Sequence, residues 1–482
     1  MGSASDLRFL ARSVVKPNPG SREFEKLLLT GFDFRSLKQS IFHKRVLLFD
    51  TSRGSKEEEE DGFDFELCSK KLKETLAITL DKCYPFAGRL VQEEDGTLVF
   101  LSNDAGVEFI DAASPVSISE LLGNDRFQFE ERLCPDIPFE LEQLAKGGVG
   151  GSSAAAAVPI LAAQMTRFDQ GGFAIGVTFH HGASDGTSVF QFLKVWAEIS
   201  RGDEVSSPLD FSSRAQLLNL TPHTTDSQLS TTSEIPKMFT TAPLFGAPEV
   251  ELPQQPETAM KILFISLDIE AVNKLKLKVQ EDQKEGVASF SSYVIITALM
   301  WRASIRARQL QEEEETRCFN AVNCRVRCKR LPENHFGNAA FTAIAAAPAG
   351  HLLGNGISFA AKLIAKSIKS VSGEYLQSMS NLMEQVKLQK SVLLADFRPP
   401  HDVLVVGSSH NPSAECDFGW GQPLALKSTF MEAPLSALIW CPRHRVTGTL
   451  ELIYKATPAV ADAMLIDPEL TTFAKVESSE VV

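Results

Sequence analysis

The stretch Phe179-His180-His181-Gly182-Ala183-Ser184-Asp185-Gly186 decides the fold, because a strand pattern and a helix pattern meet at it. Bulky and small residues alternate over 173–179, which is typical of a strand with one buried face. Apolar residues then recur at helical spacing and predict a helix, with Thr187 as its N-cap and Gly202 just beyond its end. The sequence therefore predicts a strand-to-helix turn that carries reactive side chains.

His181 and Asp185 are the candidate functional residues of this turn. A neutral imidazole has a pKa near physiological pH, so His181 can take a proton from an attacking hydroxyl or amine. His-x-x-x-Asp alone is a weak signal, since many such histidines are ordinary loop residues. The doubled histidine and Gly186 after the acid make the pattern rarer. His180 is the competing base.

The composition of the 482-residue chain is that of a globular protein, with 44% apolar and 23% charged residues. This length predicts two domains. A net charge of −13 argues against a nucleic-acid binder and against binding to anionic membranes. No apolar run is long enough to span a bilayer, and residues 1–20 lack the apolar core of a signal peptide. We expect a protein without stable membrane insertion.

The eight cysteines are sparse for this length and form no Cys-x-x-Cys pair, which favours a reducing, cytoplasmic location. Cys324, Cys328 and His335 suggest metal ligands, but a fourth ligand at zinc-like spacing is missing. We therefore predict no metal site.

Strand and helix patterns interleave along the whole chain, which predicts an α/β protein with two layered lobes. A proline-rich segment without clear periodicity separates the two halves. We place the N-terminal lobe at residues 1–203, the crossover segment at 204–258 and the C-terminal lobe at 259–482. In the second half, residues 374–393 read as a helix, and Thr457-Pro458 as the start of the last one.

A second motif, Asp417-Phe418-Gly419-Trp420-Gly421, stands in the C-terminal half. Together with His181, Asp185 and Gly186, it resembles the paired signatures of the BAHD family of plant acyl-CoA-dependent acyltransferases. Lesser features of that family follow in the expected order along essentially the whole chain: Tyr84-Pro85-Phe86-Ala87-Gly88-Arg89, Trp196-Ala197-Glu198-Ile199, Arg325-x-Arg327 and Phe336-Gly337-Asn338.

The resemblance implies two chloramphenicol-acetyltransferase-like lobes, each a mixed sheet with flanking helices, joined by a long crossover. It implies acyl-CoA as co-substrate, with no further cofactor, and a small alcohol or amine as acceptor. His181, the histidine four residues before the acid, would be the general base of a ternary complex without a covalent enzyme intermediate. His180 would be a structural or binding residue. Asp185 would pair with an arginine, assigned here as Arg325, and support the turn together with Gly186. Residues 417–421 would be structural, since glycines around a tryptophan suit a tight turn.

Two departures from the family pattern concern the acceptor. His335 stands where a tyrosine commonly precedes Phe-Gly-Asn, and Gly407-Ser408-Ser409-His410 replaces residues common in hydroxycinnamoyl-transferring members. These departures argue against shikimate or quinate as acceptor. They leave the donor open between aromatic and aliphatic acyl groups.

The sequence thus predicts a cytoplasmic, monomeric acyltransferase of specialised metabolism. A peptide-bond condensation domain shares the doubled histidine, but it predicts carrier-domain sequence nearby and lacks the second motif. A non-catalytic relative that acts as a binding or regulatory protein is the alternative from another class, and the intact histidine motif argues against it.

Overall fold

The computed structural model describes most of the chain. These residues are 7–18, 25–38, 42–50, 64–121, 131–138, 157–218, 235–245, 260–283, 289–328, 331–399, 401–407, 412–429, 436–441 and 448–479.

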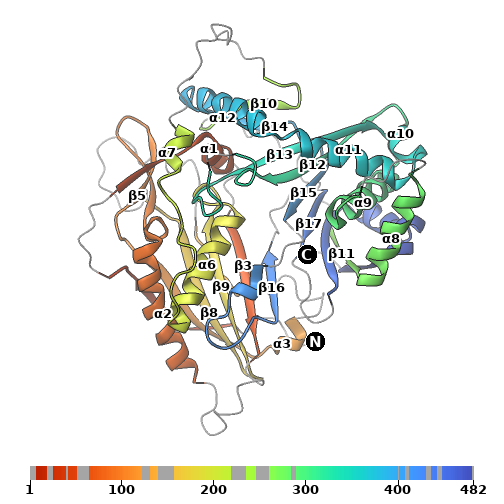
Figure 1. Ribbon diagram of the computed structural model, residues 1–482. Coiled ribbons are helices and arrows are strands. Elements are labelled where there is room, and N and C mark those ends of the chain that lie inside the picture. The colour runs from red at the N-terminus through yellow and green to blue at the C-terminus, as the bar shows by residue number, and fades with distance from the viewer. Residues whose placement is uncertain are drawn as a thin grey trace.

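The first lobe is built on a mixed six-stranded sheet, and the prediction of an α/β fold with two sheet-rich lobes is confirmed (Figure 1). Only β6 and β8 run parallel in it, and the other neighbours are antiparallel. In spatial order its strands are β1 (Arg8–Val15), β6 (Val107–Ser114), β8 (Leu161–Phe168), β9 (Phe173–His180), β3 (Phe42–Phe49) and β16 (Ala425–Thr429). A smaller sheet beside it has the order β2 (Glu25–Leu28), β5 (Leu98–Ser102), β4 (Arg89–Gln92) and β7 (Val158–Pro159).

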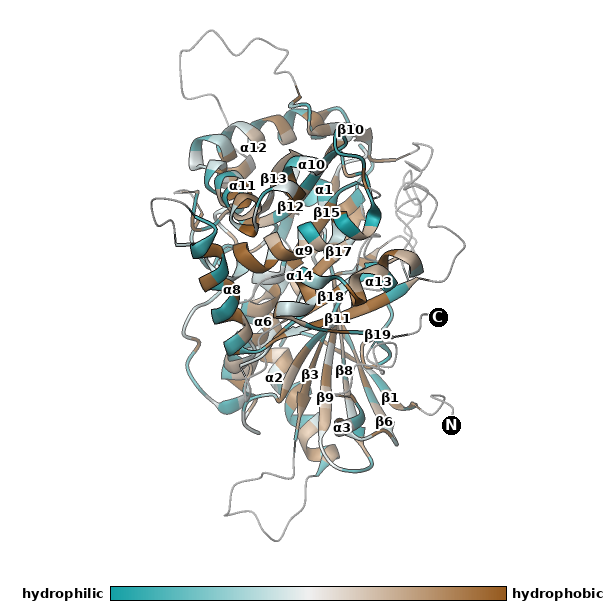
Figure 2. Cartoon of the chain, turned by 90° about the vertical axis from the view of Figure 1, so that its right-hand side faces the viewer, coloured by the Kyte–Doolittle hydropathy of each residue, from teal (hydrophilic) through white to brown (hydrophobic). Residues whose placement is uncertain are grey.

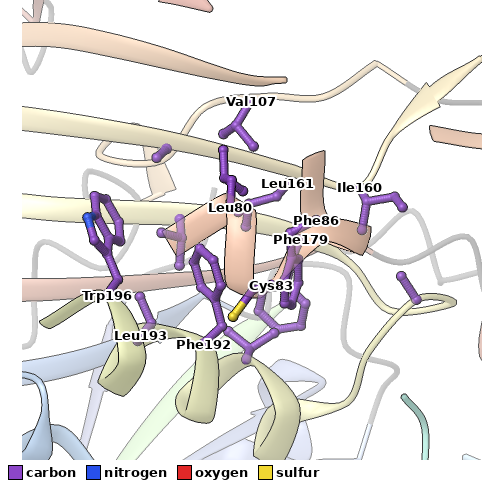
Figure 3. Packing of buried hydrophobic residues seen from close by; sticks show 14 of the residues in the cluster. Leu80, Cys83, Phe86, Val107, Ile160, Leu161, Phe179, Phe192, Leu193 and Trp196 are labelled. Carbon is purple, nitrogen blue, oxygen red and sulfur yellow. The ribbon is translucent and has the colours of Figure 1, made fainter. Parts of the chain in front are cut away.

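Two long helices, α2 (Phe65–Lys82) and α6 (Gly186–Arg201), pack against each other in this lobe. Their apolar faces join the sheet in one core, where large rings such as Phe179, Phe192 and Trp196 are fully buried (Figure 3). The short helix α3 (Ile118–Leu121) also belongs to this lobe, and a 3-10 turn, η1 (Tyr84–Ala87), follows α2. The short helix α1 (Gly31–Lys38) packs instead against α12 (Gly373–Leu388) and β14 (Ser391–Ala395), from the second half of the chain. The helix that follows the histidine turn is therefore anchored along its length.

The second lobe contains a mixed seven-stranded sheet. Its strands in order are β13 (Ala340–Pro348), β12 (Glu315–Asn323), β15 (Val403–Gly407), β17 (Ala437–Trp440), β18 (Leu450–Ala456), β11 (Lys261–Leu267) and β19 (Lys475–Ser479). Figure 2 shows helices gathered over this lobe. They are α8 (Ile269–Glu281), α9 (Ser292–Arg308), α10 (Ala349–Gly354), α11 (Ile357–Ser370), α13 (Pro458–Leu465) and α14 (Pro468–Phe473).

The crossover contributes two elements where it is described, α7 (Arg214–Leu218) and β10 (Phe239–Pro243). β10 pairs with β14 (Ser391–Ala395), the strand that follows α12 (Gly373–Leu388). The helix predicted over 374–393 is therefore too long at its C-terminal end. Lys390 adopts a positive φ of 55°, which ends the helix and releases the next residues to pair with the crossover.

Two predictions about helix starts have different outcomes. Thr457 and Pro458 begin α13 as predicted, with the proline in the first turn, but this helix is not the last, because α14 follows it. The predicted N-cap Thr187 is wrong, because Asp185 caps α6 by accepting a hydrogen bond from the backbone N–H of Ser188. Asp185 and Thr187 are both favourable caps, and the wider contacts of Asp185 select it.

The segment 412–429, which begins with η4 (Pro412–Glu415) and lies in the second half of the sequence, packs on the first lobe. Its strand β16 pairs antiparallel with β3 and extends the first sheet. Phe418 is fully buried there, 5.1 Å from Trp196 and 6.1 Å from Phe49 between ring centroids. The lobe boundaries at 203 and 259 stay predictions, and Asp417–Gly421 lies against the N-terminal sheet.

No helix in the described ranges has both the length and the apolar composition needed to cross a membrane.

Replacing Phe418 with alanine should lower the free energy of unfolding by about 3–5 kcal/mol, because it removes a buried ring between two others. Urea denaturation followed by tryptophan fluorescence measures the change. Leu388→Ala is the control, since Leu388 is 81% exposed, and should change stability by less than about 0.5 kcal/mol. Equal midpoints for Phe418→Ala and the wild type would contradict the role of this ring.

Candidate active site

The histidine turn joins the end of β9 to the start of α6. His180 is the last residue of the strand, and Gly186 is the first of the helix. Asp185 stands between them in extended conformation, with φ −86° and ψ 176°, so that its side chain folds back over the first turn of α6. The helix and the sheet are both buried in the first core, so the turn has rigid supports on either side.

Asp185 and Arg325 form a buried, two-pronged ion pair. Arg325 Nη1 donates to Asp185 Oδ2 at 2.7 Å, and Nη2 donates to Oδ1 at 3.0 Å. The backbone N–H groups of Ser188 and Ala339 donate to the same carboxylate at 3.1 and 3.0 Å. Burial would raise the pKa of Asp185, but the Arg325 charge and these donors outweigh it and hold the pKa below its ordinary value. The structure thus brings together the two residues that the sequence assigned as a pair.

The same guanidinium holds the segment that precedes β13. Arg325 donates to the carbonyl oxygens of His335 and Gly337 at 3.1 and 2.9 Å. Ser188 Oγ lies among them and accepts from Gly337 N at 3.1 Å. Gly337 has a φ of 128°, and an added Cβ would lie 2.4 Å from Arg214 Nη1, so no other residue type fits this position. The start of α6 and the strand β13 of the second lobe are therefore fixed to one another.

His181 is half-buried and does not share the carboxylate of Asp185, whose oxygens are occupied by the donors described above. Its Nδ1 atom is buried and makes no hydrogen bond to another residue within the described ranges. Asn338 Nδ2 donates to the carbonyl oxygen of His181 at 2.8 Å and fixes the backbone. Burial lowers the pKa of His181, Asp185 and Asn338 act against this, and Arg45 adds to it, so that the imidazole is neutral at neutral pH.

His180 is fully buried and serves the turn itself. Its Nδ1 accepts a hydrogen bond from Gly182 N at 2.9 Å, and its ring meets Phe42 edge-on at 4.9 Å between centroids. Gly182 is required here because an added Cβ would lie 2.9 Å from the His180 ring. Burial, followed by the charge on His181, lowers the pKa of His180 to about 3. These contacts place His180 as a support of the turn.

The loop Asp417–Gly421 lies at the far end of α6. Arg201, the last residue of that helix, donates to the carbonyl oxygen of Asp417. The Trp420 ring meets Phe173 edge-on at 5.4 Å and lies 5.2 Å from Lys71 Nζ. The loop therefore braces the helix whose opposite end carries the turn, and it does not reach the histidines.

Several residues that support the turn carry no signal in the sequence. Asp33 of α1 is fully buried, accepts from Asn338 Nδ2 at 2.9 Å and pairs with Arg214 of α7 at 2.8 Å. His43 of β3 faces His181, with ring centroids 4.4 Å apart at 80°. Their sequence neighbours form no motif, and only the strand order β9-β3 brings His43 to the turn.

Of the two departures from the family pattern, the structure describes His335 in full. His335 is buried and shares a 2.6 Å hydrogen bond between its Nδ1 and Ser213 Oγ of the crossover. Burial lowers the pKa of His335 to about 4, with the charges of Arg325 and Arg214 acting in the same direction. Residues 408–410 lie outside the described residues. Cys324 is buried, and within the described ranges no cluster of three or more His, Cys, Asp or Glu side chains has the geometry to hold a metal ion.

Comparisons with known proteins agree with this architecture. A family model described as the Transferase family matches residues 7–453. A hydroxycinnamoyltransferase from Narcissus pseudonarcissus is 30% identical over 361 residues, which cover 74% of this chain and 77% of the relative. Rosmarinate synthase from Plectranthus scutellarioides is 30% identical over 366 residues, with coverage of 75% and 78%.

Among solved structures, vinorine synthase matches with a TM-score of 0.68 and 20% identity over 98% of this chain and 99% of that one. TRI101 from F. graminearum, in complex with coenzyme A and T-2 mycotoxin, matches with a TM-score of 0.73 and 15% identity over 94% and 99%. At these identities the two structures show the shared fold.

A histidine turn between two mixed sheets, together with a family match over most of the chain, defines an acyltransferase class of protein. The chain belongs to the transferase family, the BAHD acyl-CoA-dependent acyltransferases. It is an acyl-CoA-dependent O- or N-acyltransferase, and the named relatives are enzymes, which supports the catalytic interpretation over a non-catalytic binding protein.

Replacing Arg325 with methionine should lower the free energy of unfolding by about 3–5 kcal/mol, because it leaves Asp185 charged and buried without its partner. Urea denaturation at pH 7 measures the loss. Arg12→Met is the matched control, since Arg12 pairs with Glu108 but is 59% exposed, and should change stability by less than about 1 kcal/mol. If both variants lose the same small amount, the buried pair does not hold the turn.

The depressed pKa of His180 predicts a stability that falls in acid. The unfolded chain binds a proton near pH 6.5, whereas the folded protein binds it only near pH 3. This contribution to stability is therefore complete above pH 6.5 and is lost as the pH falls toward 3, at about 1.4 kcal/mol per pH unit. His180→Asn keeps an acceptor for Gly182 N but cannot titrate, so its stability should fall less steeply between pH 6.5 and 4.5 in urea unfolding. Parallel curves for the two proteins would show that His180 is not the source.

Proposed function

We propose that the protein transfers an acyl group from acyl-CoA to a hydroxyl or amine of a small specialised metabolite, with His181 as general base. The observation that carries this proposal is the commitment of Asp185 to Arg325, which leaves His181 as a neutral imidazole at a rigid turn. In the proposed site, Asp185, Gly186 and Arg325 support the turn, and Asp417–Gly421 braces α6.

The reaction follows from ordinary acid–base chemistry. His181 takes the proton of the acceptor as its oxygen or nitrogen attacks the thioester carbonyl, and such proton transfer contributes about 10²–10⁴ in rate. The tetrahedral intermediate then collapses, the carbon–sulfur bond breaks, and the CoA thiolate leaves with a proton returned by the imidazolium. A thiolate is a good leaving group, so donor and acceptor react in one ternary complex without a covalent enzyme intermediate. No cofactor beyond acyl-CoA is needed.

The names of the relatives suggest donors and acceptors for the first assays. They include hydroxycinnamoyl transfer to shikimate and to the nitrogen of 5-hydroxyanthranilate. Coumaroyl-CoA is therefore the first donor to try, beside acetyl-, malonyl- and long-chain acyl-CoA. The departure from the family sequence at Gly407-Ser408-Ser409-His410 argues for alcohols and amines other than shikimate or quinate. We further propose a cytoplasmic monomer.

The test is the release of free CoA thiol from each donor in the presence of pooled plant alcohols and amines. Thiol release by the wild type should depend on an acceptor, and His181→Ala should lower kcat by about 10²–10⁴. Because the pKa of His181 is lowered, the acid limb of kcat/KM should lie below pH 6.5. Thiol release that persists in His181→Ala would remove His181 as the base. A folded wild type that is silent with every donor and acceptor would favour a binding protein.

A further inference from the structure

A histidine that acts as a base is normally oriented by a third group, often a carboxylate. Asp185 does not fill that position for His181, because its two oxygens already accept four hydrogen bonds, from Arg325, Ser188 N and Ala339 N. Asn338 fixes the backbone of His181 through its carbonyl oxygen. Asn338 and the backbone of His181 itself also act on the imidazole and raise its pKa. A neighbour that packs against the imidazole would be a further source of orientation.

His43 lies where such a source would be. β3 and β9 are adjacent, and His43 is paired in register with Phe179, two residues before His181. The rings of His43 and His181 meet edge-to-face, with centroids 4.4 Å apart and an interplanar angle of 80°. The ring of Phe179 also contacts the His43 ring, with centroids 5.6 Å apart, so His43 is itself supported by the sheet.

We propose that His43 is a positioning residue, whose ring holds the imidazole of His181 edge-to-face so that Nε2 points to the acceptor. The proposal rests on His181 as the general base. Nδ1 of His181 is buried, which leaves Nε2 as the nitrogen for the substrate. Edge-to-face pairs of rings prefer this geometry beyond the area that they bury. A side chain on a central strand also holds its position better than one on a loop.

The surroundings of His43 keep its own ring uncharged. Burial lowers the pKa of His43 well below its ordinary value, and the charges on His181, Arg45 and His180 act in the same direction. A neutral ring beside the base leaves the imidazole of His181 able to accept a proton. A cation at the same place would oppose the imidazolium that forms during transfer.

The experiment compares two replacements of His43 in the full-length protein. His43→Phe keeps an aromatic ring, and His43→Leu keeps most of the volume without one. We expect His43→Leu to lower kcat about three- to tenfold, with the KM for acyl-CoA within about twofold of wild type, and His43→Phe to keep kcat within about twofold. His351→Leu, at an exposed position of α10, is the control and should match the wild type.

A second readout follows the base directly. In ¹⁵N-labelled protein, the ring nitrogens of His181 should report one neutral tautomer in the wild type and in His43→Phe, and a mixture in His43→Leu. His181→Ala identifies the signal. If His43→Leu does not fold, His43→Met supplies the same comparison with a flexible aliphatic side chain.

Three outcomes would overturn the inference. An unchanged kcat in His43→Leu or His43→Met means that the ring contact does not orient the base. A kcat in His43→Phe as low as in His43→Leu means that His43 acts through its nitrogens, as in a proton relay. Full activity in His181→Ala removes the base itself, and with it both this inference and the proposed function, whereas failure at His43 alone leaves the function intact.

Discussion

The turn between β9 and α6 depends on one interaction, the buried ion pair of Asp185 and Arg325. Both side chains are withdrawn from water, and such a pair is costly unless each oxygen and N–H finds a partner. Here that condition is met, because the carboxylate accepts four hydrogen bonds and the guanidinium also binds the carbonyl oxygens of His335 and Gly337. A fully satisfied buried network has one arrangement, and any rotation of Asp185 would leave donors unpaired. The pair therefore specifies the geometry of the turn more than it stabilises the fold.

This interaction also ties together parts of the chain that are far apart in sequence. Arg325 follows β12 of the second lobe, whereas Asp185 caps a helix of the first. A second polar chain runs beside it, from Arg214 of the crossover through Asp33 to Asn338, which holds the backbone of His181. Each link is buried, so a shift of either lobe would expose or unpair a charge. The position of the imidazole is thus set jointly by both lobes and the crossover.

The sequence predicted the parts of this site that local patterns encode. The alternation over 173–179 and the helical spacing after it predicted the strand, the turn and the helix, and the resemblance of two motifs to known signatures indicated the family. It placed the cap at Thr187 because threonine suits an N-cap. The contacts of Asp185 with Ser188 N and with distant partners show that the cap lies two residues earlier. The end of α12 was missed for a similar reason, since residues 391–395 become a strand by pairing with the crossover. His43 has no local signature, because its role arises from strand order alone.

Among the residues that the structure describes, no carboxylate is hydrogen-bonded to His181, and this arrangement suits the reaction that the family performs. A carboxylate would raise the pKa of the imidazole and make it a stronger base, but a larger share of the protein would then be protonated at neutral pH. Burial and Arg45 act in the opposite direction and keep His181 neutral, at the cost of basicity. A thioester tolerates this weaker base, because a thiol has a pKa near 8.5 and leaves far more readily than an alkoxide. The site therefore requires a correctly oriented imidazole more than a strongly basic one. An uncharged neighbour such as His43 would orient the ring without raising its basicity.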